Sequence, residues 1–387
     1  MKKTLAAVAV LGAFAGSALA ADVQLYGIVD TGLRYMHFDG DSVNAGYDAT
    51  DSFEMKSGMQ SGSRFGFKGT EDLGNGLTVG FILENQFDSD TGALKNEDSF
   101  FHREASLFLQ GGFGKIAMGR MGSINGGVSS WGKYGMMSAF GTSWDYSAQV
   151  GTWAVGGGMW DNMIAYETPD FAGFKVFAQY GMGNSVNDAS VENESSSDRY
   201  YAIGASYGNG PLNLYLAVDS TNYASWDGTT ATDTDDSLTV TFGGNYDFEV
   251  LKLFAGVQYF DEAKVSSAFG LLDAADYNNG VKFASKLKGF GVGLSASIPV
   301  AGGNVLVGAG YMDAEAADSQ DTATSTTKND ELTRWVVSAG YDYPLSKRTN
   351  VYGILTYAQD SLEYTTTATP DQDPTVFAAM VGLRHKF

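Results

Sequence analysis

The sequence predicts an all-β fold, a 16-stranded antiparallel transmembrane β-barrel, and three observations support this prediction. The 387-residue chain holds 50 glycines, 24 phenylalanines and 21 tyrosines but only 6 prolines, which is typical of many strands joined by turns. Apolar and polar residues alternate with a period of two in many short segments. Short and long connections also alternate along the chain, as the turns and outer loops of outer-membrane barrels do.

Sixteen strands follow from counting the hairpins between turn signals. The predicted strands cover residues 23–38, 63–72, 76–88, 100–111, 114–121, 161–169, 173–182, 199–208, 211–222, 237–247, 251–261, 289–299, 304–313, 332–343, 350–360 and 376–387. An even number places both chain ends on the periplasmic side of a barrel. A seventeenth strand at 277–288 would break this up-and-down order, so we expect that segment to belong to the loop before residue 289.

Alternation of apolar and polar side chains justifies these strands in turn. The first strand has its valines and leucines on one face. In the second strand, Phe65 and Phe67 fall on one face, and Arg64 and Lys68 fall on the other. The third strand sets Glu84 against a row of apolar residues. This pattern is typical of a sheet with one apolar face and one wet face, so the charged residues should face the inside of the barrel.

Two kinds of connection separate the strands. Tight turns rich in Gly, Asn, Asp and Pro lie at 72–76, 111–114, 168–170, 208–211, 247–249, 299–303 and 344–349, and long polar connections lie at 39–62, 184–198, 222–236 and 313–331. Most acidic residues fall in the long loops, which indicates a solvated surface at the cell exterior. An alternative is that divalent cations, which prefer oxygen ligands, bind these carboxylates loosely and bridge them to outer-membrane lipid and lipopolysaccharide.

The beginning of the chain predicts a targeting segment. Lys2 and Lys3 precede the short apolar run 5–15, and Ala18-Leu19-Ala20 forms a small-residue cleavage site, so residues 1–20 read as a cleaved secretory signal peptide. The apolar run is too short for a membrane-spanning helix, which needs about 20 residues. The barrel should then occupy residues 21–387, in the envelope of a bacterium.

Composition excludes several classes of function. The chain carries 24 Lys and Arg against 45 Asp and Glu, a formal net charge of −21, which argues against a nucleic-acid partner because phosphate binding needs basic surface. The absence of cysteine excludes disulfides, cysteine-bound zinc and iron–sulfur clusters, and three histidines leave little for a histidine metal site. We therefore expect no cofactor apart from loosely bound divalent cations.

Motifs spread over the chain resemble a known family. They are Val23-Gln24-Leu25-Tyr26-Gly27, the segments 63–69 and 71–74, Tyr166-Glu167-Thr168-Pro169 with Phe171-Ala172-Gly173, the segment 341–349, and the C-terminal segment 381–387. The chain resembles the Gram-negative general porins, nearest to the β-proteobacterial and neisserial type. The resemblance implies a homotrimer, a passive channel for ions and small hydrophilic solutes, a third loop folded into the lumen, and a terminal Phe387 similar to the signal read by the barrel-assembly machinery.

The longest loop, about 122–160, is aromatic rather than polar. Its tryptophans and tyrosines include Trp131, Tyr134, Trp144 and Tyr146, and its few charges include Lys133 and Asp145. An exposed mobile loop would be polar, so this loop should be ordered against another surface. The resemblance places it inside the barrel as the constriction of the pore.

A basic wall should face that loop. Strand phase turns Arg34, Arg64 and Lys68 inward, and Glu84 and Glu167 inward by the same argument. Arg103 and Arg120 join them because they match the lumen arginines of the family in position. Charges lining a narrow pore set its ion selectivity. The five cations stand against four carboxylates, Glu84, Asp145, Asp161 and Glu167, and this one excess cation predicts a weak preference for anions. An alternative is that internal ion pairs neutralise these cations and only brace the barrel.

Other functions remain as alternatives. The loop aromatics would suit a channel that prefers sugars or another small solute, and the acidic loops would suit a surface receptor or adhesin on a barrel anchor. An outer-membrane hydrolase is disfavoured, because Gly204-Ala205-Ser206-Tyr207-Gly208 lies at the end of a predicted strand, whereas the Gly-x-Ser-x-Gly nucleophile needs a strand-to-helix elbow. We therefore predict a channel and not an enzyme.

Overall fold

The computed structural model describes most of the barrel. It covers residues 23–40, 49–141, 152–153, 158–185, 190–226, 229, 235–265, 271, 283–318, 330–365 and 371–387. The predicted signal peptide, 1–20, lies outside the described residues. Among the described residues, no helix is both long and apolar enough to cross a membrane.

Seventeen β-strands and one short 3-10 helix make up the described structure. They are β1 (Gln24–Asp39), β2 (Thr50–Ser57), β3 (Arg64–Gly74), β4 (Leu77–Gln86), β5 (Glu104–Gly111), β6 (Gly114–Gly122), η1 (Tyr134–Met137), β7 (Met159–Glu167), β8 (Phe174–Ser185), β9 (Ser197–Asn209), β10 (Leu212–Asn222), β11 (Leu238–Asp247), β12 (Lys252–Ala263), β13 (Leu287–Val300), β14 (Gly303–Ala316), β15 (Glu331–Pro344), β16 (Thr349–Glu363) and β17 (Thr375–Lys386). Each predicted strand overlaps one of these.

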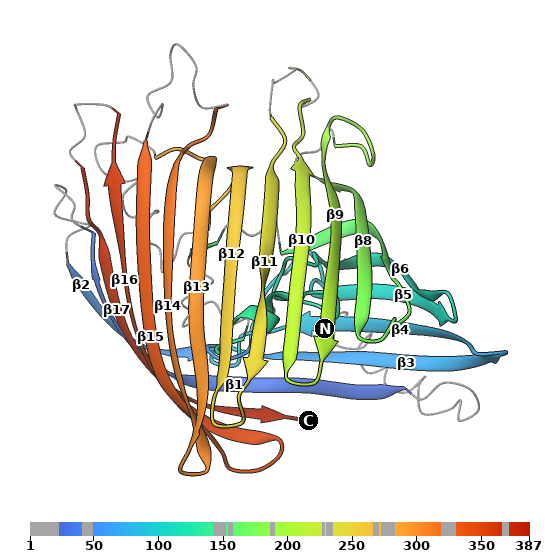
Figure 1. The fold of residues 1–387 in the computed structure, drawn as a ribbon, viewed down its shortest axis with the longest axis horizontal. Coiled ribbons are helices and arrows are strands. Elements are labelled where there is room, and N and C mark those ends of the chain that lie inside the picture. The colour runs from blue at the N-terminus through green and yellow to red at the C-terminus, as the bar shows by residue number, and fades with distance from the viewer. Residues whose placement is uncertain are drawn as a thin grey trace, which may run out of the picture.

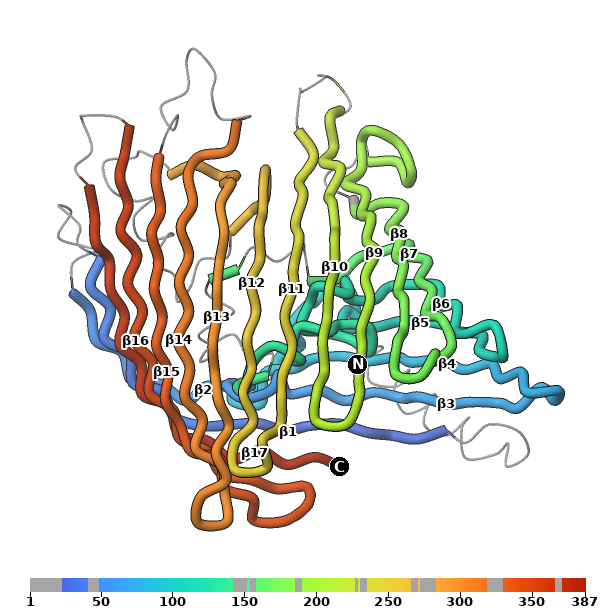
Figure 2. The backbone as a smooth tube through the Cα atoms, viewed as in Figure 1, coloured from blue at the N-terminus to red at the C-terminus, as the bar shows by residue number. Residues whose placement is uncertain are grey.

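The strands close into a barrel because the last pairs with the first. β17 runs antiparallel to β1 from Ile28↔Lys386 to Asp39↔Thr375, and every strand from β3 to β16 pairs with its successor. Figure 1 shows β9 to β16 side by side, with β3 to β6 crossing them at a steep angle. In Figure 2 the blue trace of β1 runs near the red end of β17. A closed sheet leaves no unpaired edge in the bilayer.

Seventeen segments form sixteen positions in the wall. β2 and β3 both pair with the same edge of β1, with Ser57 opposite Thr31 and Arg64 opposite Ile28. The two segments are therefore halves of one interrupted strand, and the prediction of a 16-stranded antiparallel barrel is confirmed. The expectation that 39–62 is entirely loop is wrong, because Thr50–Ser57 forms a strand that pairs with residues 31–38 of β1.

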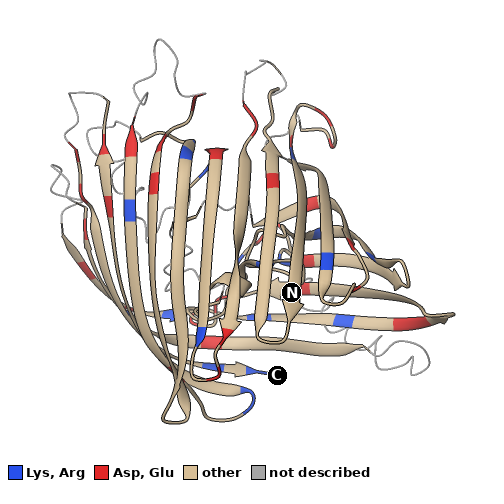
Figure 3. Ribbon diagram, in the orientation of Figure 1, with Lys and Arg blue, Asp and Glu red and all other residues tan. Residues whose placement is uncertain are grey.

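The wall has an apolar outside and a polar inside. On β15, Trp335 and Val337 are exposed, whereas the alternate residues Arg334 and Ser338 are buried inside. Lipid surrounds the outer face, so a charged side chain there would cost about 2–4 kcal/mol at the midplane. Figure 3 shows acidic residues at the loop ends of several strands. Examples are Glu262 at the end of β12 and Glu331 at the start of β15.

Candidate channel constriction

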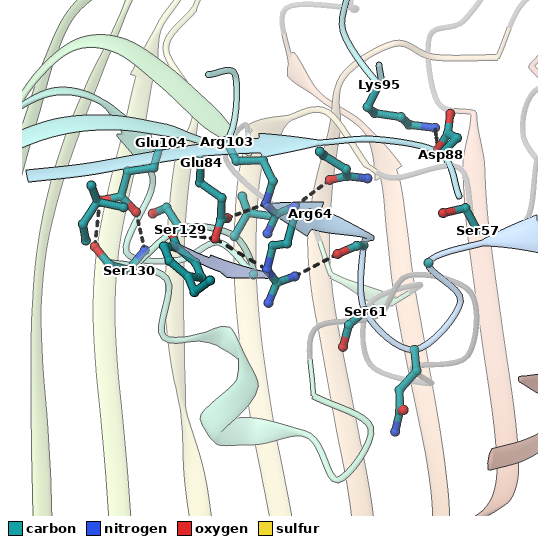
Figure 4. Close-up of a pocket in the computed structure, with 18 of the residues that line it drawn as sticks. Ser57, Ser61, Arg64, Glu84, Asp88, Lys95, Arg103, Glu104, Ser129 and Ser130 are labelled. Atoms are coloured by element: carbon teal, nitrogen blue, oxygen red, sulfur yellow. Dashed lines mark hydrogen bonds and ion pairs between the residues drawn. The ribbon is translucent and has the colours of Figure 1, made fainter. Parts of the chain in front are cut away.

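A cavity of about 660 Å³ lies inside the barrel, between the interrupted strand and the long loop that follows β6. Its lining residues come from four parts of the chain: Lys56–Gly62 without Met59, the strands β3 to β5 with Tyr26 of β1, the β4–β5 connection, and Gly127–Ser130 of the long loop. Figure 4 shows Arg64, Glu84 and Arg103 meeting at its centre, with Ser61 and Ser130 on either side.

One carboxylate holds two guanidinium groups in this cavity. Glu84 Oε1 accepts a hydrogen bond from Arg103 Nε at 2.6 Å, and Glu84 Oε2 lies 3.5 Å from Arg64 Nε. Tyr26 also donates its hydroxyl proton to Glu84 Oε2 at 3.0 Å, and Arg103 Nη1 donates to Gln86 at 2.6 Å. Glu84 therefore fixes both arginines in place but neutralises only one positive charge.

Cations outnumber carboxylates around the cavity. The lining contains Lys56, Arg64, Lys68, Lys95 and Arg103 against Glu84, Asp88 and Glu104. Lys68 Nζ lies 5.2 Å from the centre of the Tyr26 ring, which is within the range of a cation–π contact. Burial lowers the pKa of His102, and the charges of Arg103 and Arg120 lower it further, which disfavours the charged imidazolium. The positive charge therefore comes from lysine and arginine.

The segment 123–141 of the long loop lies against inward-facing side chains of the wall. The backbone N–H of Ile124 donates to Gln179 of β8 at 2.7 Å, and its carbonyl accepts from the Tyr215 hydroxyl of β10 at 3.0 Å. Farther along, the carbonyl of Met136 accepts from Asn245 Nδ2 at 2.8 Å, and the N–H of Ala139 donates to Ser295 Oγ at 3.0 Å. The segment therefore crosses the inside of the wall from β8 to β13.

Glycines on the inner face let the loop approach the wall. A Cβ atom built on Gly256 of β12 would lie 2.4 Å from the Trp153 ring, and one on Gly308 of β14 would lie 2.9 Å from the Phe140 ring. Both distances are shorter than van der Waals contact, so the loop aromatics occupy the space that larger residues would fill. The loop is thus seated directly on the backbone of the wall.

Glu104 anchors the start of the loop and was not predicted. It is buried on β5, where Oε1 accepts hydrogen bonds from the hydroxyls of Ser106 and Ser130, both at 2.8 Å. Oε2 accepts the backbone N–H of Ser130 at 2.8 Å. A carboxylate in a membrane strand indicates an inward position, but the sequence does not show which loop residues it holds.

The predicted loop residues divide into two groups. Trp131 and Tyr134 are buried, and Tyr134 packs against Trp153 with ring centroids 4.9 Å apart, so these aromatics pack under the loop. Lys133 Nζ lies 4.8 Å from the Phe177 ring of β8, and the described cavity lining does not include Lys133. Trp144, Asp145 and Tyr146 lie outside the described residues.

Two predicted wall residues face inward but do not line the cavity. Arg34 faces inward on β1 and pairs with Glu54 of β2, where its Nε donates at 2.9 Å. Glu167 faces inward near the end of β7 and accepts a hydrogen bond from Lys175 Nζ at 2.8 Å. The cavity lining described above contains neither residue, although it contains Arg64, Lys68, Glu84 and Arg103. These four predicted wall residues therefore line one cavity together.

Arg120 lies on the face opposite to the expected one. It pairs in register with Ala105, two residues from the pair of Leu107 and Met118, whose side chains are 53% and 54% exposed. Alternate residues share a face, so Arg120 belongs to the outer face, where it forms an ion pair with Asp161. The expectation that Arg120 faces the lumen is wrong. Its position near the loop end of β6 reduces the cost of charge on that face, because the penalty falls to about 0–1 kcal/mol near the interface.

The comparisons with known proteins agree with this architecture. Residues 6–362 match the family model described as Gram-negative porin. The chain is 34% identical to an outer membrane porin protein of Bordetella pertussis over all of both chains, and 32% identical to outer membrane porin protein 32 of Delftia acidovorans, covering 93% of this chain and 90% of that one. It is also similar in structure to the anion-selective porin from Comamonas acidovorans, with a TM-score of 0.67 and 27% identity over 95% of this chain and all of the other. The chain therefore belongs to the Gram-negative porins, the passive diffusion channels of the bacterial outer membrane.

Proposed function

We propose that the cavity around Arg64 and Arg103 is the narrowest part of a water-filled channel and that it favours small anions over cations. The main observation behind this proposal is an excess of positive charge. Arg64, Arg103 and Lys68 all line the cavity, and among the described residues Glu84 is the carboxylate that forms ion pairs with both arginines. Rows of charge in a narrow pore set ion selectivity. The Comamonas acidovorans neighbour is described as anion-selective, which supports the same sign.

The acidic loops oppose this preference at the channel mouth. Salt screens exposed charges over about 8 Å at physiological ionic strength, whereas charges partly surrounded by protein are screened less and act more strongly. Arg103 is buried to 8% relative exposure, and its partner Glu84 is buried to the same degree. The cavity should therefore decide the selectivity of the open channel, and the loops should modify how ions approach it.

Neutralising both cavity arginines should reverse the preference. In the double variant Arg64→Gln with Arg103→Gln, Glu84 would lose both of its ion-pair partners and become an uncompensated negative charge at the narrowest point. We expect the reversal potential in a salt gradient, measured across planar bilayers, to move toward cation selectivity. Arg120→Gln is the matched control, because Arg120 lies on the outer face. A double variant that matches wild type would place the current path elsewhere.

We propose that the channel is a homotrimer, as the family resemblance implies. The outer face of β1 is apolar and exposed at Leu25, Val29 and Leu33, which suits contact with either lipid or a neighbouring subunit. A solved structure with the same fold, OmpT of Vibrio cholerae, is described as a trimer form. Analytical ultracentrifugation in mild detergent should show a trimer, and a purely monomeric species would overturn this proposal.

Two further proposals concern the surroundings of the channel and its chemistry. The acidic loop ends, such as Glu315 and Glu331, would bind divalent cations loosely and through them lipopolysaccharide.

We propose no enzymatic activity, since Ser206 lies within the regular pairing of β9 with β10, where it is opposite Tyr215, rather than at a strand-to-helix elbow.

A further inference from the structure

We infer that the constriction of the channel has a second element besides the long loop. This element is the inner turn, Gly58–Ser63, which narrows the pore from the side opposite the long loop. The inference rests on the proposed function, because it assumes that the cavity lies on the current path. It adds a specificity-determining element that strand alternation does not reveal, since this segment interrupts one strand and does not connect two neighbouring strands.

The inner turn leaves the wall because its length does not match its partner. β2 ends at Ser57 opposite Thr31, and β3 resumes at Arg64 opposite Ile28. Along β1 only residues 29 and 30 separate these two pairs, whereas the turn occupies 58–63. The surplus residues cannot stay in the sheet, and Gly58 begins the departure with a φ of +73°, a conformation that glycine adopts at little cost.

Asp30 of β1 holds the inner turn in place through hydrogen bonds. Its Oδ2 accepts the backbone N–H of Gln60 at 2.8 Å and that of Ser61 at 2.6 Å. Its Oδ1 accepts the hydroxyl of Tyr352 at 2.6 Å, and its backbone carbonyl accepts the N–H of Gly58 at 2.8 Å. Asp30 is completely buried. These bonds satisfy the backbone groups that would otherwise be unpaired inside the barrel, so the turn is a defined structure.

Met59 of the inner turn shares an apolar cluster with Phe140 of the long loop. It is completely buried, and a Cβ on Gly32 would lie 2.1 Å from the backbone carbonyl oxygen of Val381 and 2.4 Å from Met59 Cε, so the backbone contact requires glycine there and Met59 fills the remaining space. Met59 belongs to one apolar cluster with Tyr352 and Met380 of the wall and Phe140 of the loop. The inner turn and the long loop are therefore both anchored to the wall in this cluster, which should fix their relative positions.

The remaining face of the inner turn borders the cavity. Gly58, Gln60, Ser61 and Gly62 line it on one side, and Gly127–Ser130 of the long loop line it on another. Ser61 Oγ also accepts a hydrogen bond from Arg384 Nη1 at 2.9 Å, which orients its hydroxyl. A solute drawn to Arg64 would therefore pass between hydroxyl and backbone groups of the inner turn and of the long loop (Figure 4).

Cysteine labelling tests the inner turn directly, because the natural chain contains no cysteine. Ser61→Cys would be treated with thiosulfonate reagents carrying either a sulfonate or a trimethylammonium group, and single channels would be recorded before and after treatment. Both labels should lower the conductance by about twofold or more, because each fills part of a narrow pore. The sulfonate should shift the reversal potential toward cations, and the trimethylammonium should shift it toward anions.

Val29→Cys is the matched control, since Val29 lies at the same level of β1 but is exposed on the outer face. Its treatment should leave the current unchanged. The inference fails if mass spectrometry shows Ser61→Cys labelled while conductance and selectivity stay constant, or if the folded protein reacts only after denaturation. Failure of the arginine test alone would instead remove the proposed anion preference, while a current blocked by the label would still place the inner turn in the pore.

Discussion

Deleting residues 131–141 of the long loop, with a short glycine linker in their place, should raise the single-channel conductance by about twofold or more, because pore width limits conduction. The deleted segment contains the contacts of Met136 and Ala139 with the inner wall and the buried rings of Trp131 and Tyr134. The barrel strands themselves are untouched, so the variant should still insert into planar bilayers.

A substitution in the wall supplies the opposite change. Gly256→Ala would place a Cβ 2.4 Å from the Trp153 ring, so the loop must move toward the lumen. We expect its conductance to fall while that of the deletion rises. Gly353→Ala is the control, because a Cβ there would meet its nearest atoms at an ordinary 3.7 Å. Equal conductance in the deletion and the wild type would show that the segment does not narrow the current path.

Strand alternation predicted most of the wall because lipid outside and water inside impose opposite chemistry on neighbouring residues. The strand prediction failed where acidic residues obscure the alternation. Thr50–Ser57 turns Phe53 and Met55 outward, but Asp51 and Glu54 make the segment look like an acidic loop. The inner turn that follows was missed for a different reason. Its buried position depends on Asp30, which is distant in sequence and invisible to a local pattern.

The two arginines placed by resemblance show what alternation and resemblance each contribute. Arg103 precedes the first residue of β5, so phase cannot orient it, and only resemblance suggested a lumen position; in the structure it pairs with Glu84. In the structure, Ile116 and Met118 occupy the same phase on β6 as Arg120 and face outward. The lumen position of Arg120 rested on resemblance alone. The partners of Glu104 required the folded loop and were beyond either argument.

Removing Phe387 should cause the largest loss of folded protein among these changes. Its backbone N–H donates to the carbonyl of Gly27 at 3.0 Å, and its carbonyl accepts the N–H of Gly27 at 3.1 Å. This pair continues the seam between β17 and β1 that closes the barrel. Two net hydrogen bonds contribute about 2 kcal/mol in total, a factor of up to about 30 in the folded fraction, and unpaired groups facing lipid would add to that cost.

A second variant separates the seam from the aromatic ring. The Phe387 ring lies against Gly27, where a Cβ would meet it at 2.4 Å. Phe387→Leu keeps the backbone pair but removes the ring, which we propose as the signal for the barrel-assembly machinery. Refolding into detergent, followed by heat-modified gel mobility, should be impaired in the deletion and near normal in Phe387→Leu. In cells, outer-membrane levels should fall in both. Normal cellular levels of Phe387→Leu would show that the machinery does not need the ring, and normal refolding of the deletion would show that the barrel closes without its last pair.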